Sequence, residues 1–210
     1  MKIESIVLGM VQTNTFFVID EKTKKTIIID PAGEANRILD KIKNDNLQVE
    51  KICITHGHFD HIGAAAEVKK ATGAEIIIHQ QGERYLEDGY YNLSSVFGTN
   101  IVPVEADTYV QHGDEIELEG TDIKFRVIHA PGHTLDGVAY YSEAYEVAFV
   151  GDILFKSSIG RTDFPGGNMK MLLTSIKENL FVLPDNTVVY SGHGAPTTIG
   201  YEKRTNPNFL

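Results

Sequence analysis

The sequence is poor in cysteine, in long apolar runs and in positive charge. Cys53 is the only cysteine among 210 residues, so an internal disulfide is excluded, which argues against a secreted disulfide-stabilised scaffold. No apolar run approaches the roughly 20 residues of a membrane-spanning helix. Glu4 and Gln12 interrupt the apolar stretch at the N-terminus, which is not typical of a signal peptide. From these absences we expect a soluble, cytoplasmic protein.

Acidic residues outnumber basic ones, 29 Asp and Glu against 19 Lys and Arg, and the formal net charge is −10. Nucleic-acid binding needs a basic face, and binding to anionic membranes needs polybasic segments. We therefore expect neither a nucleic-acid partner nor a membrane partner. The length and the hydrophobic content of 42% are typical of one globular domain, and no linker or repeat divides residues 1–210.

Apolar periodicity predicts short strands mixed with helices. The expected strands cover residues 3–8, 15–19, 25–30, 49–55, 75–79, 101–104, 108–111, 114–119, 122–128, 137–142, 145–150 and, as the final one, 187–190. The expected helices cover residues 34–46, 62–72, 80–88 and 168–182, the last with Met171, Leu172, Ile176 and Leu180 facing inward. Residues 89–100 and 151–168 are expected to be loops. Such a mixture predicts an α/β fold of sheets covered by helices.

One predicted strand runs directly into THGHFDH, residues 55–61. On leaving an extended strand, residues i and i+2 point to the same side, so His56 and His58 can bind one ion. Asp60 and His61 follow where a helix begins, and they can serve a second ion. Imidazole and carboxylate suit zinc, iron or manganese. A group of solvated loop histidines is the alternative, and the dense pattern after a strand disfavours it.

Three further strand ends carry a histidine or an aspartate beside glycine: HAPGH with His133, VGD with Asp152, and SGHG with His193. His133 would complete a set with His56 and His58, and His193 would complete the set of Asp60 and His61. Asp152 has two oxygens and can bridge two cations. Singly, a turn histidine or a capping aspartate would explain these residues. Together they give three ligands per ion and a bridge, and leave the open positions typical of catalytic metals.

Three remaining histidines lack this context. His129 lies within a predicted strand, where a packed or hydrogen-bonded histidine is the better interpretation. We expect His79 and His112 to be non-ligands as well.

In order and spacing, THGHFDH, PGHT (131–134), GD (151–152) and GHG (192–194) resemble the motifs of the metallo-β-lactamase superfamily, over essentially the whole chain. The resemblance implies a four-layer αββα sandwich of two mixed sheets flanked by helices, with the site at the edge of the sheets. It also implies a first metal bound by His56, His58 and His133, and a second bound by Asp60, His61 and His193. Asp152 would bridge the two.

Within the superfamily, the loop GDILFKSSIGRTDFPGG is similar to that of glyoxalase II, the hydroxyacylglutathione hydrolases, and most of all to their short bacterial branch. This implies hydrolysis of a thioester of a small thiol, such as S-lactoylglutathione, by a metal-bound hydroxide. Asp60 and Asp152 would be catalytic, and the cofactors two divalent ions, zinc ahead of iron or manganese. The C-terminal helical domain of full-length glyoxalase II is not expected here.

The family's loop lysine aligns with Arg161, and its following tyrosine aligns with Asp163. We expect Arg161 to bind a substrate carboxylate, since a guanidinium can do so with two hydrogen bonds. An ion pair with Asp163 is the alternative. The loop of residues 89–100 contains Tyr90, Tyr91 and Phe97 and could cover the cleft. Packing in a core is the more common role of such aromatic residues.

Persulfide dioxygenases are the strongest rival family, because they share this fold and a similar GRTDF loop. They use one iron held by two histidines and the bridging aspartate, all of which are present. The superfamily also includes tRNA-maturing nucleases, which the acidic charge disfavours, and β-lactamases, which the glyoxalase-like loop disfavours. A non-catalytic binding module would be expected to have lost some of the ligands.

Overall fold

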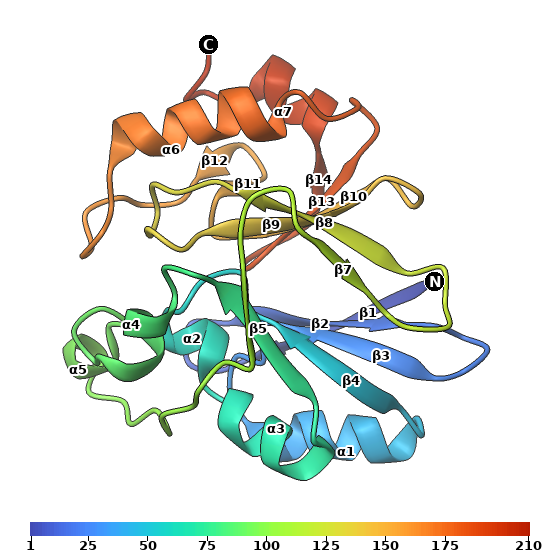
Figure 1. Ribbon diagram of the computed structural model, residues 1–210. Coiled ribbons are helices and arrows are strands. Elements are labelled where there is room, and N and C mark those ends of the chain that lie inside the picture. The colour runs from blue at the N-terminus through green and yellow to red at the C-terminus, as the bar shows by residue number, and fades with distance from the viewer.

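Two six-stranded sheets lie face to face, and helices cover their outer faces (Figure 1). The computed structural model describes all residues from 1 to 210. The first sheet contains β1 (Lys2–Leu8), β2 (Thr13–Ile19), β3 (Lys25–Ile29), β4 (Gln48–Cys53), β5 (Glu75–His79) and β6 (Thr108–Val110), in that order. The second has the order β14 (Thr197–Thr198), β13 (Val188–Ser191), β10 (Val147–Gly151), β9 (Val138–Ser142), β8 (Lys124–His129) and β7 (Glu115–Glu117).

The direction of the strands brings their carboxyl ends to one edge of the sandwich. In the first sheet β3, β4, β5 and β6 are parallel neighbours, after an antiparallel start through β1 and β2. In the second sheet β9 is antiparallel to both β8 and β10, and β13 is parallel to β10. It follows that β8, β10 and β13 all run the same way, and whatever follows these strands collects at the same edge.

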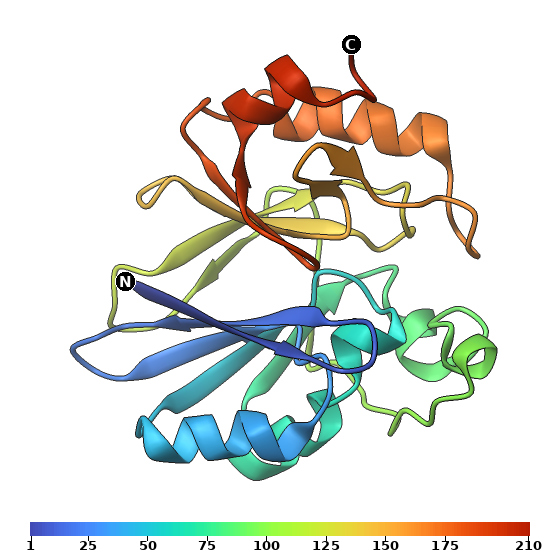
Figure 2. The ribbon, with the colours of Figure 1, turned by 180° about the vertical axis from the view of Figure 1, so that it is seen from behind.

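Most helices form two outer layers on opposite sides of the pair of sheets, as both the front view and the back view show (Figures 1 and 2). Beneath the first sheet lie α1 (Ala35–Asn44) and α3 (Ala65–Thr72). Above the second lie α6 (Met169–Ser175), the π-helical turn η1 (Ile176–Leu180) and α7 (Ile199–Thr205). At the edge of the sandwich are three short helices, α2 (Phe59–Ile62), α4 (Glu83–Glu87) and α5 (Ser94–Phe97), and the hairpin of β11 (Leu154–Phe155) and β12 (Ser158–Ile159).

Apolar side chains form one core between the sheets and one under each helical layer. Phe125 and Phe149 belong to the core between the sheets, where their rings lie 5.7 Å apart. Ile38 of α1 packs in the core below the first sheet, and Leu172 of α6 in the core above the second. Fully burying such a side chain contributes about 1.5 to 3 kcal/mol. The predicted four-layer αββα sandwich is therefore confirmed.

Most predicted elements are present, and most of the errors concern elements too short to show a clear apolar period. No strand forms over residues 101–104, the expected loop 89–100 contains α5, and the expected loop 151–168 contains the hairpin of β11 and β12. The expected helix 168–182 is divided between α6 and η1, and Met171 is 38% exposed and not inward. β13 is not the final element, because β14 and α7 follow it. A two-residue strand and a seven-residue helix are too short to give a clear period.

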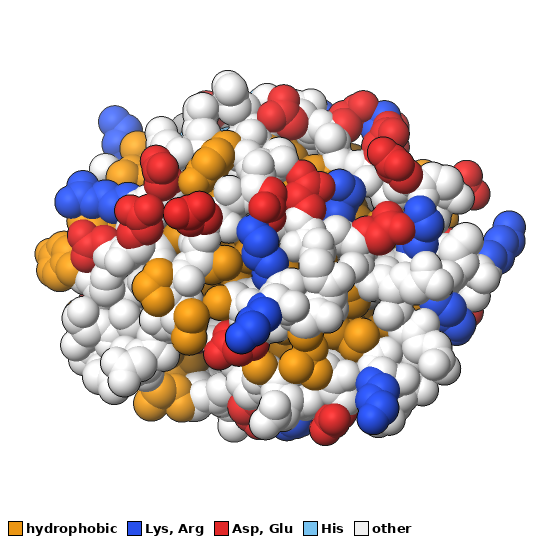
Figure 3. All heavy atoms as spheres, turned by 60° about the horizontal axis from the view of Figure 1, so that its bottom comes forward, with side chains coloured by type: hydrophobic (Ala, Val, Ile, Leu, Met, Phe, Trp, Pro, Cys, Tyr) orange, Lys and Arg blue, Asp and Glu red, His pale blue; other side chains and the backbone are white.

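The charges on the molecule are mixed and not gathered by sign on the face that Figure 3 shows. Lys and Arg side chains lie there among Asp and Glu side chains, with apolar atoms between them. None of the helices combines the length and the apolarity that crossing a bilayer requires.

Candidate metal centre

Seven predicted ligands converge at the edge where β4, β8, β10 and β13 end. Their ligand atoms form three groups within each of which all atoms lie within 4.8 Å of one another: His56–His58–His133, His56–His61–Asp152, and Asp60–His61–His193. The structure thus brings all seven predicted ligands together, and two of the three groups have the composition of the expected ligand sets. That they bind metal stays a prediction.

The first group is a set of three imidazole nitrogens around one point. His58 Nδ1 lies 3.1 Å from His56 Nε2 and 3.0 Å from His133 Nε2. All three side chains are buried. Nitrogen atoms facing one another at this spacing favour a cation between them.

The second group alternates imidazole and carboxylate. His193 Nε2 lies 3.2 Å from Asp60 Oδ2, and His61 Nε2 lies 3.4 Å from the same oxygen. Asp152 links the two groups, since its Oδ1 is 3.4 Å from His61 Nε2 while its Oδ2 is 3.8 Å from His133 Nε2. The carboxylate of Asp152 therefore lies where a bridging ligand is needed.

Three buried polar atoms of the predicted ligands have no hydrogen-bond partner: His58 Nε2, His61 Nε2 and Asp152 Oδ1. Leaving a buried polar atom without a partner costs free energy, and such atoms are rare in native proteins. A divalent ion would satisfy His61 Nε2 and Asp152 Oδ1, which both face other ligand atoms. The nitrogen and oxygen donors also match what zinc, iron and manganese accept. The residues present therefore fit two divalent ions.

Hydrogen bonds from outside the cluster orient the rings. His61 Nδ1 donates to Asp30 Oδ2 at 2.8 Å, and His133 Nδ1 donates to the Arg161 carbonyl at 2.7 Å. His193 Nδ1 donates more weakly to the Gln12 carbonyl at 3.3 Å. With Nδ1 carrying the proton, Nε2 of each ring is left as the metal-facing atom, and such outer partners raise ligand basicity.

Asp30 is a functional residue that the sequence analysis missed, because it interpreted Asp30-Pro31 only as a turn. The side chain is 2% exposed and also accepts hydrogen bonds from Thr55 N at 2.7 Å and Thr55 Oγ1 at 2.6 Å. Thr13 is a second missed residue, since its hydroxyl donates to Asp60 Oδ2 at 2.7 Å. The only signal for Asp30 was its place at the carboxyl end of an apolar strand, which Asp152 shares.

Close approach explains the glycine beside His193. A Cβ atom on Gly192 would collide with Asp152 Oδ1 and with the ring of His61. Gly151 has a φ of 51°, and a side chain there would collide with Thr55. The glycines next to the ligands thus let two strand ends come close enough to share one site.

Charge divides the cluster into a neutral and an ion-paired part. Burial, with help from the neighbouring histidines, holds the pKa values of His56 and His58 well below the ordinary value of imidazole. Burial also opposes charge on His193, but the carboxylates of Asp152 and Asp60 outweigh it and raise the pKa of His193 to about 10. Neutral imidazole is the form that binds metal, so the first group is ready to bind.

A buried carboxyl group, Asp136, supports the backbone between His56 and His58. It is fully buried, and its Oδ2 accepts a hydrogen bond from Gly57 N at 2.9 Å. Burial raises the pKa of Asp136 to about 7 from an ordinary value of 3.8. At pH values between these two pKa values, Asp136 is therefore protonated in the folded protein and ionised in the unfolded chain.

Because the native state then binds more protons, this group makes stability fall as pH rises through that window. Asp136→Asn keeps an acceptor for Gly57 but removes the titration. Between pH 4 and pH 8, the variant of the metal-free protein should gain about 4 kcal/mol relative to wild type, taking about three pKa units at about 1.4 kcal/mol per unit. Urea unfolding at both pH values measures this, and parallel stability profiles for the two proteins would contradict it.

The three remaining histidines lie outside the cluster, as predicted. His79 and His129 stack on each other with ring centroids 3.9 Å apart, and His129 Nε2 hydrogen bonds the Leu135 carbonyl at 2.9 Å. His112 accepts a hydrogen bond from His129 N at 3.2 Å. None of them belongs to a potential metal group, and the predicted packed role of His129 is confirmed.

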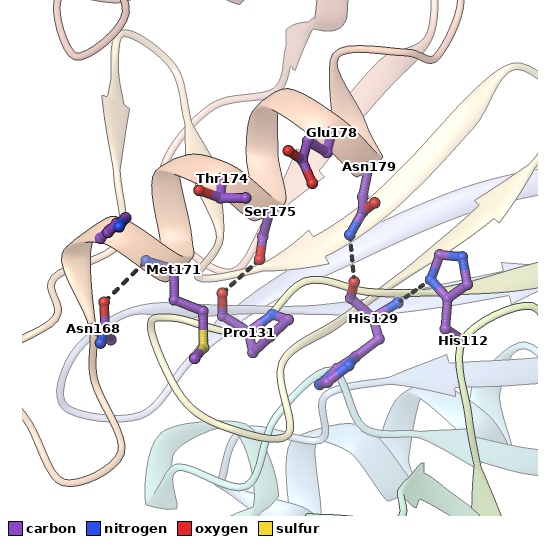
Figure 4. A pocket seen from close by; sticks show the side chains of 10 residues that line it. His112, His129, Pro131, Asn168, Met171, Thr174, Ser175, Glu178 and Asn179 are labelled. Atoms are coloured by element: carbon purple, nitrogen blue, oxygen red, sulfur yellow. Dashed lines mark hydrogen bonds between the residues drawn. The ribbon is translucent and has the colours of Figure 1, made fainter.

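His112 and His129 line an open depression of about 630 Å³ beside α6, which contains none of the seven predicted ligands (Figure 4). Asn179 Nδ2 donates there to the His129 carbonyl at 2.9 Å, and Ser175 Oγ donates to the Pro131 carbonyl at 2.8 Å (Figure 4). These bonds fasten the segment that precedes His133 to the helical layer.

A cleft of about 510 Å³ opens beside the predicted ligands His58, Asp60, His133, Asp152 and His193. Arg161 lines this cleft, and its guanidinium pairs with Asp163 through contacts of 2.7 and 2.6 Å. The alternative role for Arg161 is therefore present. Both side chains are more than half exposed, so the pair contributes little to stability and can open for a ligand.

Comparison with known proteins agrees with this geometry. The model of the "Metallo-beta-lactamase superfamily" matches residues 8–193. The chain is 38% identical over 209 residues to hydroxyacylglutathione hydrolase GloC of Haemophilus influenzae, covering 99% of this chain and 97% of that protein.

Two solved structures superimpose closely on this one. BLEG-1, described as a B3 metallo-beta-lactamase, has a TM-score of 0.94 and 37% identity, with all of both chains covered. TTHA1623, solved in a di-iron-bound form, has a TM-score of 0.86 and 35% identity, covering 99% of this chain and 100% of that one. The chain therefore belongs to the metallo-beta-lactamase superfamily and is a metallo-hydrolase of that family.

Proposed function

We propose that the chain hydrolyses the thioester of a small thiol, using two divalent ions held by the seven converging side chains. The observation that carries this proposal is the pair of ligand groups joined by Asp152, with its Oδ1 and His61 Nε2 lacking any other partner. The likeness to GloC supports a hydroxyacylglutathione-type substrate, such as S-lactoylglutathione. The di-iron form of TTHA1623 supports iron beside zinc as the metal, with manganese a further option.

The ions would activate water, and the side chains would hold the ions and orient the water. When bound, divalent ions lower the pKa of water from 15.7 to about 7, which makes a nucleophile available at neutral pH. Asp60 would orient the attacking water through Oδ1, since Thr13 holds Oδ2 at 2.7 Å. Before any ion binds, His61 and His193 lower the pKa of Asp60 to about 2 despite its burial, and bound cations in their place would keep it ionised.

The reaction itself forms a C–O bond at the acyl carbon and breaks the C–S bond. The products are a carboxylate and a thiol, and of the two protons of water one passes to the thiolate and the other to solvent. A cysteine-like thiol has a pKa of about 8.5, so the leaving group needs no strong acid. Because both sheets contribute ligands to one site, we also propose that residues 1–210 act as a single domain.

Metal analysis of the purified protein, beside a panel of thioester and persulfide substrates, tests the proposal. We expect two metal ions per chain and release of thiol from at least one thioester. One iron per chain, with oxygen uptake on glutathione persulfide and no thioester hydrolysis, would overturn it in favour of a persulfide dioxygenase. Asp60 and His193 would then have no metal to bind.

Arg161→Ala should raise KM for a thioester with a carboxylate on its thiol, while kcat stays the same. The expected increase is about fivefold, because a hydrogen bond to a charged group is lost at an exposed position. Asp163→Asn is the matched variant, which frees Arg161 and should lower KM. Steady-state kinetics measures both, and unchanged KM in both variants would remove Arg161 from substrate binding.

A further inference from the structure

Apolar side chains make up much of the cleft lining, among them Phe155, Ile159 and Phe164. Four others, Val11, Phe59, Leu93 and Phe97, are called the apolar wall below. Arg161 lines the cleft too, next to Phe164, and is the one Lys or Arg side chain in the lining. The guanidinium of Arg161 lies 4.0 Å from the centre of the Phe164 ring.

The apolar wall is joined to the ligand segment by direct contacts. The rings of Phe59 and Phe97 lie 5.0 Å apart, and Phe59 directly follows the ligand His58. Phe59 N donates a hydrogen bond to the Asn92 carbonyl at 2.8 Å, which ties the α5 segment to α2. The apolar wall is therefore held next to the reacting position and is not a distant surface feature.

Backbone strain fixes one member of this wall. Leu93 has a φ of 68° and is buried, although a bulky side chain is a genuine outlier in the left-handed region. Asn92 holds the neighbouring backbone, because its side chain accepts from Ser94 N and donates to the Tyr85 carbonyl, both at 2.9 Å. Strained residues that persist tend to cluster at ligand sites.

Two side chains of the apolar wall line the cleft and are partly exposed. Val11 is 37% exposed and Phe97 is 41% exposed. Covering apolar area is favourable by an amount that grows with each methylene group. A lactoyl group has three carbons and a hydroxyl, so it offers little apolar area to cover these residues.

Arg161 and Val11 lie beside different predicted ligands, because His133 bonds the Arg161 carbonyl while His193 bonds the carbonyl of Gln12, which follows Val11. Arg161 therefore suits the anionic end of a thiol, such as a glutathione carboxylate, and the apolar wall suits the acyl group on the other side of the thioester. We propose that the preferred substrates are thioesters with an apolar acyl group of about four to eight carbons, which lies along Val11, Phe59, Leu93 and Phe97. This inference rests on the proposed function and names the acyl part of its substrate.

A series of glutathione thioesters that differ only in the acyl group tests the inference. Lactoyl, acetyl, butanoyl, hexanoyl and octanoyl thioesters are compared by kcat/KM. We expect an increase of roughly threefold to fourfold per methylene until the wall is covered, so that hexanoyl exceeds acetyl by about 100-fold. The lactoyl thioester should resemble the acetyl one.

Phe97→Ala should lower the ratio of hexanoyl to acetyl kcat/KM at least tenfold, and Phe97→Leu, which keeps much of the apolar area, should restore most of it. Val96→Ala is the matched control. Val96 is 61% exposed on the same helix but does not line the cleft. Its ratio should equal that of wild type.

A second measurement does not depend on turnover. S-methyl-, S-butyl- and S-hexylglutathione are thioethers that cannot be hydrolysed, and their Kd values are measured by calorimetry. Binding should tighten with chain length in wild type and much less in Phe97→Ala. The same Kd for all three thioethers would overturn the inference.

The outcomes separate the two proposals. If no thioester is hydrolysed, the proposed function fails, while the thioether series still reports on the apolar wall. If thioesters are hydrolysed but kcat/KM is flat or highest for the lactoyl thioester, the proposed function stands and the inference fails.

Discussion

Asp152→Ala is expected to abolish thioester hydrolysis and to reduce the metal content of the purified protein. Asp152 lies between the two ligand groups, with oxygens 3.4 Å from His61 Nε2 and 3.8 Å from His133 Nε2. Removing it would take a ligand from both predicted ions and would remove the carboxylate next to His61 and His193. We expect kcat/KM to fall by at least about 1,000-fold, since catalytic groups that act as a unit are lost together.

His58→Ala should also abolish activity and reduce the metal content, because it removes a ligand from the group of His56, His58 and His133. His112→Ala is the control, because His112 is exposed beside α6 and belongs to no ligand group. Metal analysis and kinetics on all three variants make the comparison. Full activity in the Asp152 or His58 variant would exclude the proposed centre.

Asp30→Ala is expected to be the most destabilising single change near the site. Three hydrogen bonds end on this carboxylate, two from Thr55 and one from His61. Breaking a buried ion pair by removing one partner costs about 3 to 5 kcal/mol. Metal affinity should also fall by about 10- to 100-fold, as for other residues that orient a metal-binding histidine.

Asp30→Asn separates the backbone effect from the charge effect. Asp30 has a φ of 51°, a conformation that asparagine adopts readily and alanine does not. The Asn variant should keep much of the stability but still bind metal less tightly, because one amide cannot accept all three hydrogen bonds. Urea unfolding and metal titration measure the two effects. Wild-type metal affinity in both variants would show that Asp30 only stabilises the fold.

The predicted site was recoverable because its residues are grouped in the sequence by chemistry. His56, His58, Asp60 and His61 fall within six consecutive positions, and His133, Asp152 and His193 each follow the end of a strand and stand beside a glycine. Since such strand ends meet at one edge of the sandwich, local pattern and final position agree. Asp30 has neither a histidine nor a repeated motif near it, so nothing local distinguished it from a turn residue.

The errors in the fold follow the length of the elements. The five-residue strand β5 was predicted with its observed bounds, because Ile76, Ile77 and Ile78 are β-branched and buried. The four-residue helix α5 begins at a left-handed Leu93, a conformation that no propensity predicts for leucine. Its formation depends on contacts with Asn92 and Phe59 from outside the helix.

The sequence by itself determined most of the strands and helices and the seven side chains that meet at the edge of the sheets, and its motifs implied the αββα layering through the family they resemble. Elements and ligands are local properties, since apolar periodicity decides the elements and the ligands follow strand ends. The tertiary structure alone decided which atoms support those ligands and what surrounds them. Asp30 and His61 are 31 positions apart in the sequence, and Val11 and Phe97 line the same cleft. Contacts between residues so far apart in the sequence exist only once the chain has folded.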